Sequence, residues 1–388
     1  MAVTTIQTNN KLIQFTRELQ REYVRENLFS PYMGEDITSI IRLRNELKAG
    51  GEQMNIPLVT RLNGTAIGSG TLVGNEEKID NYGMRVWLDW ARKAVTTNKA
   101  QEQKDSADIF GAAKPLLSDW GKELQRDEII EAMMALPSES QPAGLGTDPG
   151  QRVNGILFES ATVAQRNTWI QDNSDRVIFG ALISNYSSGV FTTALGTLAT
   201  TPDDFTASNV SLAKRVAKNA SPRIRPFKLG DGREYFVAFA GTNTSRDLKT
   251  SLATINKDAR PREDYSYHGA PNNPLFQDGD QIYDGVIVRE VPEISSYVTS
   301  RWTQFLTAGG SSLRVEPVFF CGQQAVTMAW GQTAKPTFRK EDDYNFISGV
   351  GVDMAYGVAK MFKKHPMDGT KLVQWGMVTG FYSSVADA

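Results

Sequence analysis

Two stretches near the start of the chain, residues 53–62 and 84–95, alternate apolar and polar positions. Alternation with a period of two is typical of half-buried strands, so the pattern predicts the two arms of an extended ribbon within residues 51–95. The apolar positions are Met54, Ile56, Leu58 and Leu62 in the first arm and Val86, Leu88, Trp90 and Ala94 in the second, with Trp87 on the opposite face. Pro57 has no N–H group, which makes the first arm an edge strand at best.

The connection between the arms carries five glycines, more than a compact two-residue hairpin turn requires: Gly64, Gly68, Gly70, Gly74 and Gly83. At strand rise, each arm is roughly 33 Å long. An isolated two-stranded ribbon is only marginally stable in water, so it has to lie on the body of its own subunit or on another subunit. An ordinary hairpin within a larger sheet is the alternative that the pattern leaves open.

Residues 1–50 predict an N-terminal arm with two short amphipathic helices. Between Leu12 and Tyr23, apolar residues recur at three- and four-residue spacing, with charged residues opposite. A second helix is predicted over residues 36–47, with Gly50-Gly51 as its stop. The segment has too little apolar surface for a core of its own, so we expect it to pack on something else.

The strongest helical pattern runs from Asp105 to Leu136 and predicts a long strut. Apolar residues recur there with the helix period, and Asp105 and Ser106 are candidate N-caps. Pro115 and Gly121 predict a kink or a break. A continuous helix of this length would span roughly 45 Å. An ordinary core helix would show the same pattern.

Residues 137–155 are rich in proline and glycine and mark the expected domain boundary. Beyond them, short mixed elements predict a compact α/β lobe. Its expected strands are residues 176–182, 234–241, 281–291 and 314–322, and its expected helices are residues 201–217 and 245–257. In the tail, residues 343–362 and 371–382 read as strands, although 352–362 fits a short helix equally well. We expect the tail to return to the long helix, so that the lobe is an insertion.

The charge balance limits the possible partners. With a net charge of -2 and an isoelectric point near 5.9, the chain lacks the basic excess that drives phosphate binding through counterion release. If a protein with this charge balance meets nucleic acid, we expect it to enclose the nucleic acid rather than bind it tightly. The N-terminus lacks the pattern of a secretory signal, and no apolar run approaches a membrane span, so we expect synthesis in the cytoplasm.

Residues with catalytic or metal-binding chemistry are sparse. The chain has only two histidines, His268 and His365, which are too few for most histidine-based triads or metal clusters. Cys321 lies in an apolar run and is expected to be a buried small hydrophobe. The acidic residues between 278 and 284 miss the spacing of a calcium loop and favour a solvated turn, and residues 341–343 favour a charged loop. We expect no catalytic residue, no metal site and no cofactor.

The order of these parts resembles the major capsid protein of tailed bacteriophages, in particular the podophage-type major capsid family long catalogued as a family of unknown function. The resemblance covers nearly the whole chain. It is carried by Tyr32-Met33-Gly34, Ile56-Pro57-Leu58-Val59, Lys335-Pro336-Thr337, Asp343-Tyr344 and residues 71–77, 176–180, 273–288, 322–331 and 357–362. The tail departs from the family pattern at Gln374-Trp375, where an acidic-aromatic pair is expected.

The resemblance implies an α+β tailed-phage major capsid fold and self-assembly into an icosahedral shell that encloses the double-stranded DNA genome of a tailed bacteriophage. The implied parts are an N-terminal arm (1–50), an extended loop over an adjacent subunit (51–98), a peripheral domain with a spine helix (99–155 and 335–388) and an inserted axial domain (156–334). No enzymatic activity is implied.

The implied partners are other copies of the chain, arranged in hexamers and pentamers. Scaffolding and portal proteins are further expected partners, and a decoration protein is an additional candidate. Double-stranded DNA is enclosed without sequence-specific binding, and no membrane is involved. The expected location is the virion capsid, after synthesis and assembly in the host cytoplasm.

Within the ribbon, we expect Met54, Ile56, Leu58, Trp87 and Trp90 to contact a neighbouring subunit, because large apolar side chains there lack a local core. Two other functions stay open. A shell protein of a cellular nanocompartment would share the fold and would enclose a cargo enzyme. A carboxylate-dependent hydrolase on a two-lobed α/β scaffold is the third hypothesis, although nothing singles out an acid and base pair.

Overall fold

The computed structural model describes residues 27–59, 62, 64–77, 79, 81–104, 110–228, 234–258, 281–339, 344, 346–365 and 369–384. The helix predicted between Leu12 and Tyr23 lies outside these ranges, as do His268 and residues 341–343. Within the described ranges, no helix is both long enough and apolar enough to cross a membrane.

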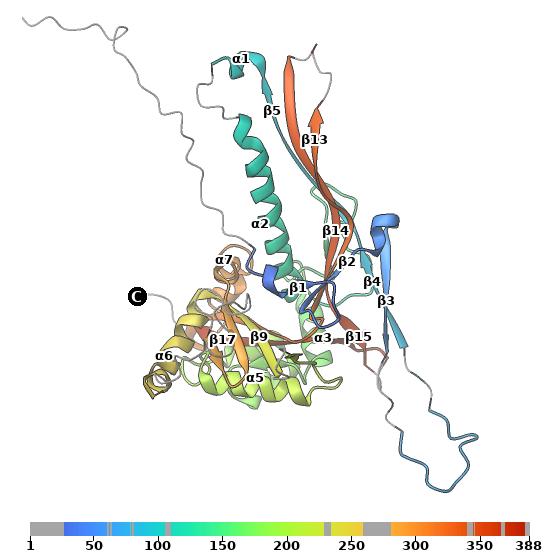
Figure 1. Ribbon diagram of the computed structural model, residues 1–388. Coiled ribbons are helices and arrows are strands. Elements are labelled where there is room, and N and C mark those ends of the chain that lie inside the picture. Colours follow the sequence, from blue (N-terminus) through green and yellow to red (C-terminus); the bar gives the residue numbers. More distant parts are fainter. Residues whose placement is uncertain are drawn as a thin grey trace, which may run out of the picture.

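A sheet built around one long strand forms the upright part of the molecule (Figure 1). Its central strand β14 (Ile347–Lys360) pairs antiparallel with β13 (Val326–Arg339) on one edge and with β5 (Asp89–Asn98) on the other. The sheet is completed by β1 (Met33–Gly34), β2 (Ile41–Arg44) and β6 (Val153–Asn154). β5 continues into the short helix α1 (Lys99–Glu102).

One long helix, α2 (Ala113–Met134), runs along one face of this sheet (Figure 1). Leu117 of α2 packs with Val350 and Val352 of β14 in a small apolar cluster. At 1.5 Å per residue, the 22-residue helix spans roughly 33 Å. The predicted strut is therefore confirmed over residues 113–134, and it stiffens the upright sheet.

The kink or break predicted in this helix is wrong. Pro115 lies in the first turn, where backbone N–H groups have no helical acceptor, so its missing N–H costs nothing. Gly121 lies inside the unbroken helix and is buried against the sheet. The candidate N-caps Asp105 and Ser106 lie outside the described residues.

A second sheet forms the core of a lobe at the base, with the strand order β10-β11-β9-β12-β17-β7 and β8 paired to β9. Helices cover both of its faces. On β9, Phe236 and Ala238 join the cluster of α5 and α6, whereas Val237 and Phe239 join the cluster of α3, α4 and α7. The strands expected over residues 176–182, 234–241 and 314–322 and both expected helices are confirmed, although α5 begins later than predicted. The single strand expected over residues 281–291 is wrong, because β10 and β11 are an antiparallel pair with a turn at Asp284 between them.

The strands of this sheet are β7 (Val177–Phe179), β8 (Phe227–Lys228), β9 (Glu234–Ala240), β10 (Gln281–Tyr283), β11 (Val286–Glu290), β12 (Arg314–Cys321) and β17 (Met377–Ser384). Its helices are α3 (Val163–Asp172), α4 (Phe191–Gly196), α5 (Ala207–Asn219), α6 (Thr242–Asp258) and α7 (Pro292–Ser300).

The tail of the chain is shared between the two sheets, which differs from the expectation. β17 lies between β12 and β7 in the second sheet, so the tail does not return as a whole to the long helix. All eight residues of β17 are buried, and a strand buried on both faces needs a sheet that helices cover on both sides. β14 is a strand throughout, so the helical alternative for residues 352–362 is wrong.

The short helix predicted over residues 36–47 is also wrong. That segment contains β2, and the 3-10 helix η3 (Glu46–Ala49) follows it. Ile41 pairs in parallel with Val326 of β13, whereas Ile37 is exposed. Adding a strand to the edge of the long sheet satisfies more backbone hydrogen bonds than a short surface helix would, and this tertiary pairing overrides the helical spacing.

Two buried polar side chains mark the junction between the sheets. Cys321, at the end of β12, is fully buried, and burial raises the pKa of its thiol, which confirms the expected small hydrophobe. Lys360, at the end of β14, points its Nζ toward the Trp169 ring at 5.1 Å from the ring centroid. No described residue accepts a hydrogen bond from this nitrogen. Burial lowers the pKa of Lys360 to about 7.

Replacing Lys360 by Met is expected to raise the free energy of unfolding of the soluble subunit at pH 7 by at least roughly 2 kcal/mol. This is the scale of a neutral unpartnered polar group, and the proton that the unfolded chain holds adds to it. The folded pKa of about 7 lies below the reference value of 10.5, so the unfolded chain holds a proton that the folded chain lacks between these values. The cost of Lys360 is therefore greatest at and below pH 7 and decreases toward pH 10.5.

Urea unfolding of both proteins at pH 7 and at about pH 10 measures this difference. The half-exposed Lys364 supplies the control, because Lys364→Met should change stability by under about 0.5 kcal/mol. Equal stability of the Lys360→Met and parent proteins at both pH values would contradict the assignment.

Candidate functional site

The ribbon is a hairpin of β3 (Gln53–Val59) and β4 (Asn81–Trp87), paired antiparallel along its whole length. Every second side chain of β3 is buried. The inward side chains of the hairpin are Met54, Ile56, Leu58, Met84 and Val86. They pack on Ala329 and Ala359 of the long sheet and on Phe362 of β15 (Phe362–Lys364), which pairs with β16 (Leu372–Gln374). The subunit itself therefore supports the base of the hairpin.

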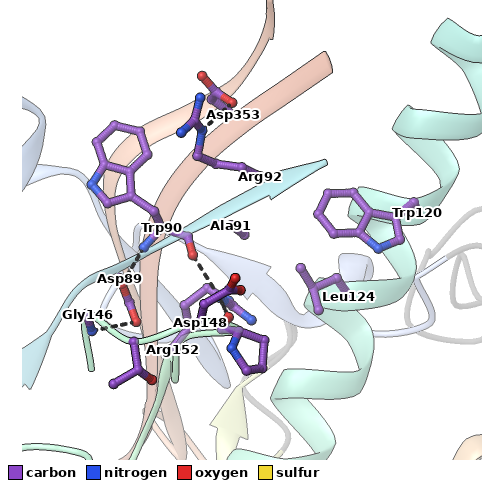
Figure 2. Close-up of a pocket in the computed structure, with 12 residues that line it drawn as sticks. Asp89, Trp90, Ala91, Arg92, Trp120, Leu124, Gly146, Asp148, Arg152 and Asp353 are labelled. Atoms are coloured by element: carbon purple, nitrogen blue, oxygen red, sulfur yellow. Dashed lines mark hydrogen bonds and ion pairs between the residues drawn. The ribbon is translucent and has the colours of Figure 1, made fainter. Parts of the chain in front are cut away.

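This packing corrects one premise of the expected contacts. The expectation that the ribbon side chains lack a local core is wrong for Met54, Ile56, Leu58 and Trp87, each of which is less than a tenth exposed. Trp90 is 53% exposed. Figure 2 shows its ring on the side of β5 away from Trp120 of α2. Of the five expected contact residues, Trp90 thus offers the most surface to a partner.

The second arm, predicted as one strand over residues 84–95, is two strands. β4 ends at Trp87 and β5 begins at Asp89. β4 pairs with β3, whereas β5 pairs with β14. The interruption at Leu88 also explains why Trp87 is buried although the alternation placed it on the polar face, because the period of two does not continue through the change of partner.

A side-chain amide holds the point where the hairpin leaves the long sheet. The edge of β14 pairs with β5 as far as Tyr356 and with β6 from Val358 onward. Asn154 of β6 accepts a hydrogen bond from Trp87 N–H at 2.9 Å and donates one to Trp87 C=O at 3.0 Å. The buried backbone of Trp87 thus keeps both hydrogen bonds where strand pairing stops.

The neighbouring residue of β14 has to be glycine. A Cβ atom built on Gly357 would lie 2.0 Å from the carbonyl oxygen of Trp87. A side chain there would push Trp87 away from Asn154, because the carbonyl oxygen in its way belongs to the backbone and cannot rotate aside. The close approach of these strands therefore depends on Gly357.

The start of β5 is fixed to the loop at residues 146–151. Asp89 is buried, and its carboxylate accepts hydrogen bonds from the N–H groups of Gly146, at 3.1 Å, and Gln151, at 3.0 Å. Arg152 Nη1 donates to Trp90 C=O at 2.8 Å. Asp89, Trp90 and Arg152 line one wall of a cavity of about 820 Å³ between β5 and α2 (Figure 2).

A buried ion pair between Arg152 and Glu128 links the start of β5 and its loop to α2. Arg152 contacts the carboxylate of Glu128 on α2 at 2.7 Å, and both side chains are nearly inaccessible. Burial raises the pKa of the Glu128 carboxyl, while the Arg152 guanidinium opposes that shift. Removing either partner would leave a buried charge uncompensated, so the pair fixes β5, α2 and the loop relative to one another.

The connection between β3 and β4 extends away from the rest of the subunit (Figure 1). Its described part carries exposed apolar side chains, with Leu72 at 68% and Val73 at 81% exposure. The others are Leu62, Ile67 and Ile79. Grouped apolar side chains that are open to water mark a contact surface. We call the described residues between 62 and 79 the tip loop.

The described residues show little that could perform chemistry. They contain no group of three or more histidine, cysteine, aspartate or glutamate side chains that could hold a metal ion. Asp284 lies in the turn between β10 and β11 and pairs with Lys214 at 2.7 Å, which fits the solvated turn expected there. Asp278 and Asp280 lie outside the described residues.

Sequence reasoning missed the residues that position the hairpin. Asn154 and Asp89 bind backbone groups of residues about sixty positions away. Asn154 lies in a stretch rich in proline and glycine, and a single polar residue there has no spacing that reveals a distant partner. Asp89, between Leu88 and Trp90, was the one available signal, since a carboxylate within an apolar run needs partners.

Comparison with known proteins identifies the family. The family described as "Phage capsid protein" matches residues 4–380. A search of curated proteins found no match. Among solved structures, the chain is similar to one from the cyanophage Pam1 capsid asymmetric unit, with 36% identity and a TM-score of 0.83 over all of both chains.

Two more distant structures share the fold. The capsid of Ralstonia phage GP4 matches with 17% identity and a TM-score of 0.70, again over all of both chains. The head of Helicobacter pylori bacteriophage KHP40 matches with 12% identity and a TM-score of 0.61, over 97% of this chain and 96% of that one.

The Asn154→Ala substitution is expected to lower the free energy of unfolding by roughly 2 to 4 kcal/mol, because it leaves both buried backbone groups of Trp87 without a partner. Urea unfolding of the soluble subunit measures this loss, and hydrogen exchange should speed up at residues 86–90. Asn81→Ala, at an exposed position of the same hairpin, is the control and should have little effect. A loss no larger than that of the control would show that Asn154 does not hold the junction.

Proposed function

The chain belongs to the phage capsid protein family and is a structural, non-enzymatic subunit of a phage capsid shell, and we propose that its tip loop and Trp90 join neighbouring subunits of that shell. The observation that carries this proposal is the hairpin itself, which is rigid at its base and presents exposed apolar residues at its far end. The family match favours a phage shell over both the cellular nanocompartment and the hydrolase.

In the proposed arrangement, the tip loop lies over an adjacent subunit. Met54, Ile56, Leu58 and Trp87 act indirectly, by fixing the hairpin on its own subunit, and Trp90 contacts the neighbour directly. Burying the exposed apolar surface of Leu72, Val73 and Trp90 at every interface would stabilise the contact between subunits. Repetition of one such contact around closed symmetry axes gives hexamers and pentamers.

We propose the following division of the subunit. Residues 1–50 form an N-terminal arm and residues 51–98 the extended loop. The peripheral domain consists of residues 99–155 and 335–388, with the strand β13 added from Val326 and β17 removed. The axial domain starts at residue 156, ends at residue 325 before β13, and takes in β17. These two adjustments are supported by the sheet to which each strand belongs.

The further partners are proposals about the assembled virion. Double-stranded DNA would be enclosed without sequence-specific binding, and a net charge of -2 suits a container that holds a polyanion at high density. Scaffolding and portal proteins would take part in assembly in the host cytoplasm, and a decoration protein is a further candidate. Electron microscopy of the purified chain, with and without a candidate scaffolding protein from the same phage, tests the scaffolding partner.

The Trp90→Asp substitution is expected to yield a soluble, folded subunit that no longer forms shells. The carboxylate would have to be desolvated at every copy of the interface, so even a loss of about 1.4 kcal/mol per contact lowers each association constant ten-fold. Negative-stain electron microscopy and sedimentation measure shell yield. Trp90→Phe is the control and should retain shells. Shells of normal yield from Trp90→Asp would overturn this contact.

Charges in the tip loop should act in the same way. The double substitution of Leu72 and Val73 by Asp is expected to abolish closed shells while leaving the thermal unfolding of the isolated subunit within about 2 °C of the parent, since both side chains are exposed. The conservative pair Leu72→Ile and Val73→Ile should assemble normally. Loss of subunit stability in the Asp variant would show instead that the tip loop packs on its own subunit.

A further inference from the structure

A cationic surface lies on the second lobe, although the chain as a whole is weakly acidic. Between residues 205 and 228 there are six lysines and arginines and no aspartate or glutamate. Arg215 and Lys218 lie on α5, and Arg223 and Arg225 lie in the segment that follows it. All four side chains are exposed. We call these four residues the cationic surface.

None of the four cations forms an ion pair with a carboxylate of the described residues, although Lys218 lies near enough to Asp284 to lower the pKa of that carboxyl. The other two lysines of the segment do pair, Lys214 with Asp284 at 2.7 Å and Lys228 with Glu234 at 3.7 Å. No ion pair joins a described carboxylate to any member of the cationic surface. Exposed charges of one sign that are left unpaired raise the local potential and attract an anion.

The segment after α5 is held firmly, so its charges are fixed in place. Ile224 is buried, and its N–H donates to Ala217 C=O of α5 at 3.3 Å. This bond places the neighbouring Arg223 and Arg225 beside the last turn of α5, which carries Lys218. Buried Arg176 donates to Pro222 C=O at 3.4 Å and also binds Asp175. Asp175, which accepts from Ser221 N–H, is thereby neutralised by a guanidinium outside the cationic surface.

The surroundings favour a polyanion over a protein partner. Protein interfaces are anchored by large apolar or aromatic side chains in their centre. No large hydrophobic side chain described between residues 205 and 228 is exposed. Exposed guanidinium groups bind phosphate through paired hydrogen bonds, and three of the four cations are arginines. The surface therefore offers charge and phosphate-binding geometry without an apolar anchor.

From these observations we infer that Arg215, Lys218, Arg223 and Arg225 form a binding site for the phosphate backbone of duplex DNA, which requires this surface to face the enclosed genome. This inference rests on the proposed enclosure of double-stranded DNA and deepens it. The contact would be independent of base sequence, because only phosphates are bound. Each subunit would contribute one small site, and the sites repeated over the shell would bind the outermost layer of DNA. The remaining surface of the weakly acidic subunit would not bind the DNA that lies deeper inside.

The test measures binding of a fluorescein-labelled duplex of arbitrary sequence to the full-length soluble subunit by anisotropy, between about 50 and 200 mM salt. The site variant combines Lys218→Gln, Arg223→Gln and Arg225→Gln. The control variant removes the same charge from exposed lysines on the upright sheet, on α1 and in the turn after α1, through Lys335→Gln, Lys99→Gln and Lys104→Gln. Circular dichroism and thermal unfolding confirm that both variants are folded.

We expect the site variant to bind at least ten-fold more weakly at the low salt concentration. The slope of log K against log salt should fall by roughly 2 to 3, since each lost phosphate contact contributes about 0.9. The control variant should stay within about two-fold of the parent. Equal losses in the two variants, or no binding by the parent, would overturn the site. Binding of polyglutamate but not of duplex by the parent would overturn it in favour of an acidic protein.

A second measurement does not depend on any variant. Ultraviolet crosslinking of DNA-filled particles, followed by mass spectrometry, should recover nucleotide adducts on peptides from residues 207–228. Adducts confined to other peptides would contradict the inference. Electron microscopy of the parent protein distinguishes failure of the proposed function from failure of this inference. If the parent forms no shells, the proposed function is wrong. If it forms shells but the four cations do not affect DNA binding, only this inference is wrong.

Discussion

The architecture of the subunit depends on how the backbone of Trp87 is satisfied. At this residue the chain exchanges one strand partner for another, and a buried backbone that stops pairing loses hydrogen bonds worth more than most side-chain contacts. The Asn154 side chain supplies both bonds, and Gly357 permits the approach. Because the chain can change strand partners there, the nearly continuous residues 81–98 form β4 of the hairpin at one end and β5 of the upright sheet at the other.

This junction makes the hairpin rigid at its base and open at its tip. The Arg152–Glu128 pair and the Asp89 carboxylate tie the start of β5 to α2 and to the loop at residues 146–151. The inward face of the hairpin is buried against its own subunit, so its direction is set before a neighbour is met. A preset arm loses less conformational entropy when it binds, which helps a shell to assemble from contacts that are individually weak.

Local patterns were enough to predict the hairpin, the long helix, the longer strands of the α/β lobe and its helices α5 and α6, because the residues of each element show its own period. The helices α3, α4 and α7 and the division of residues 281–291 into two strands were not predicted. The contacts that place these elements relative to one another could not be predicted from local patterns. The split at Leu88, the burial of Trp87 and the entry of β17 into the second sheet all result from pairing with residues tens to hundreds of positions away. The net charge also gave no sign of the cations gathered on α5 and the segment after it, since a sum carries no information about position.

A cryo-electron microscopy reconstruction of assembled particles would show whether the hairpin, packed on its own subunit at its base, contacts a neighbouring subunit with its tip loop. We expect β3 and β4 to keep the packing seen in the single subunit, and Leu72, Val73 and Trp90 to be buried against an adjacent copy. A shell in which the tip loop folds back onto its own subunit, with these three side chains facing solvent, would show that the hairpin does not join subunits.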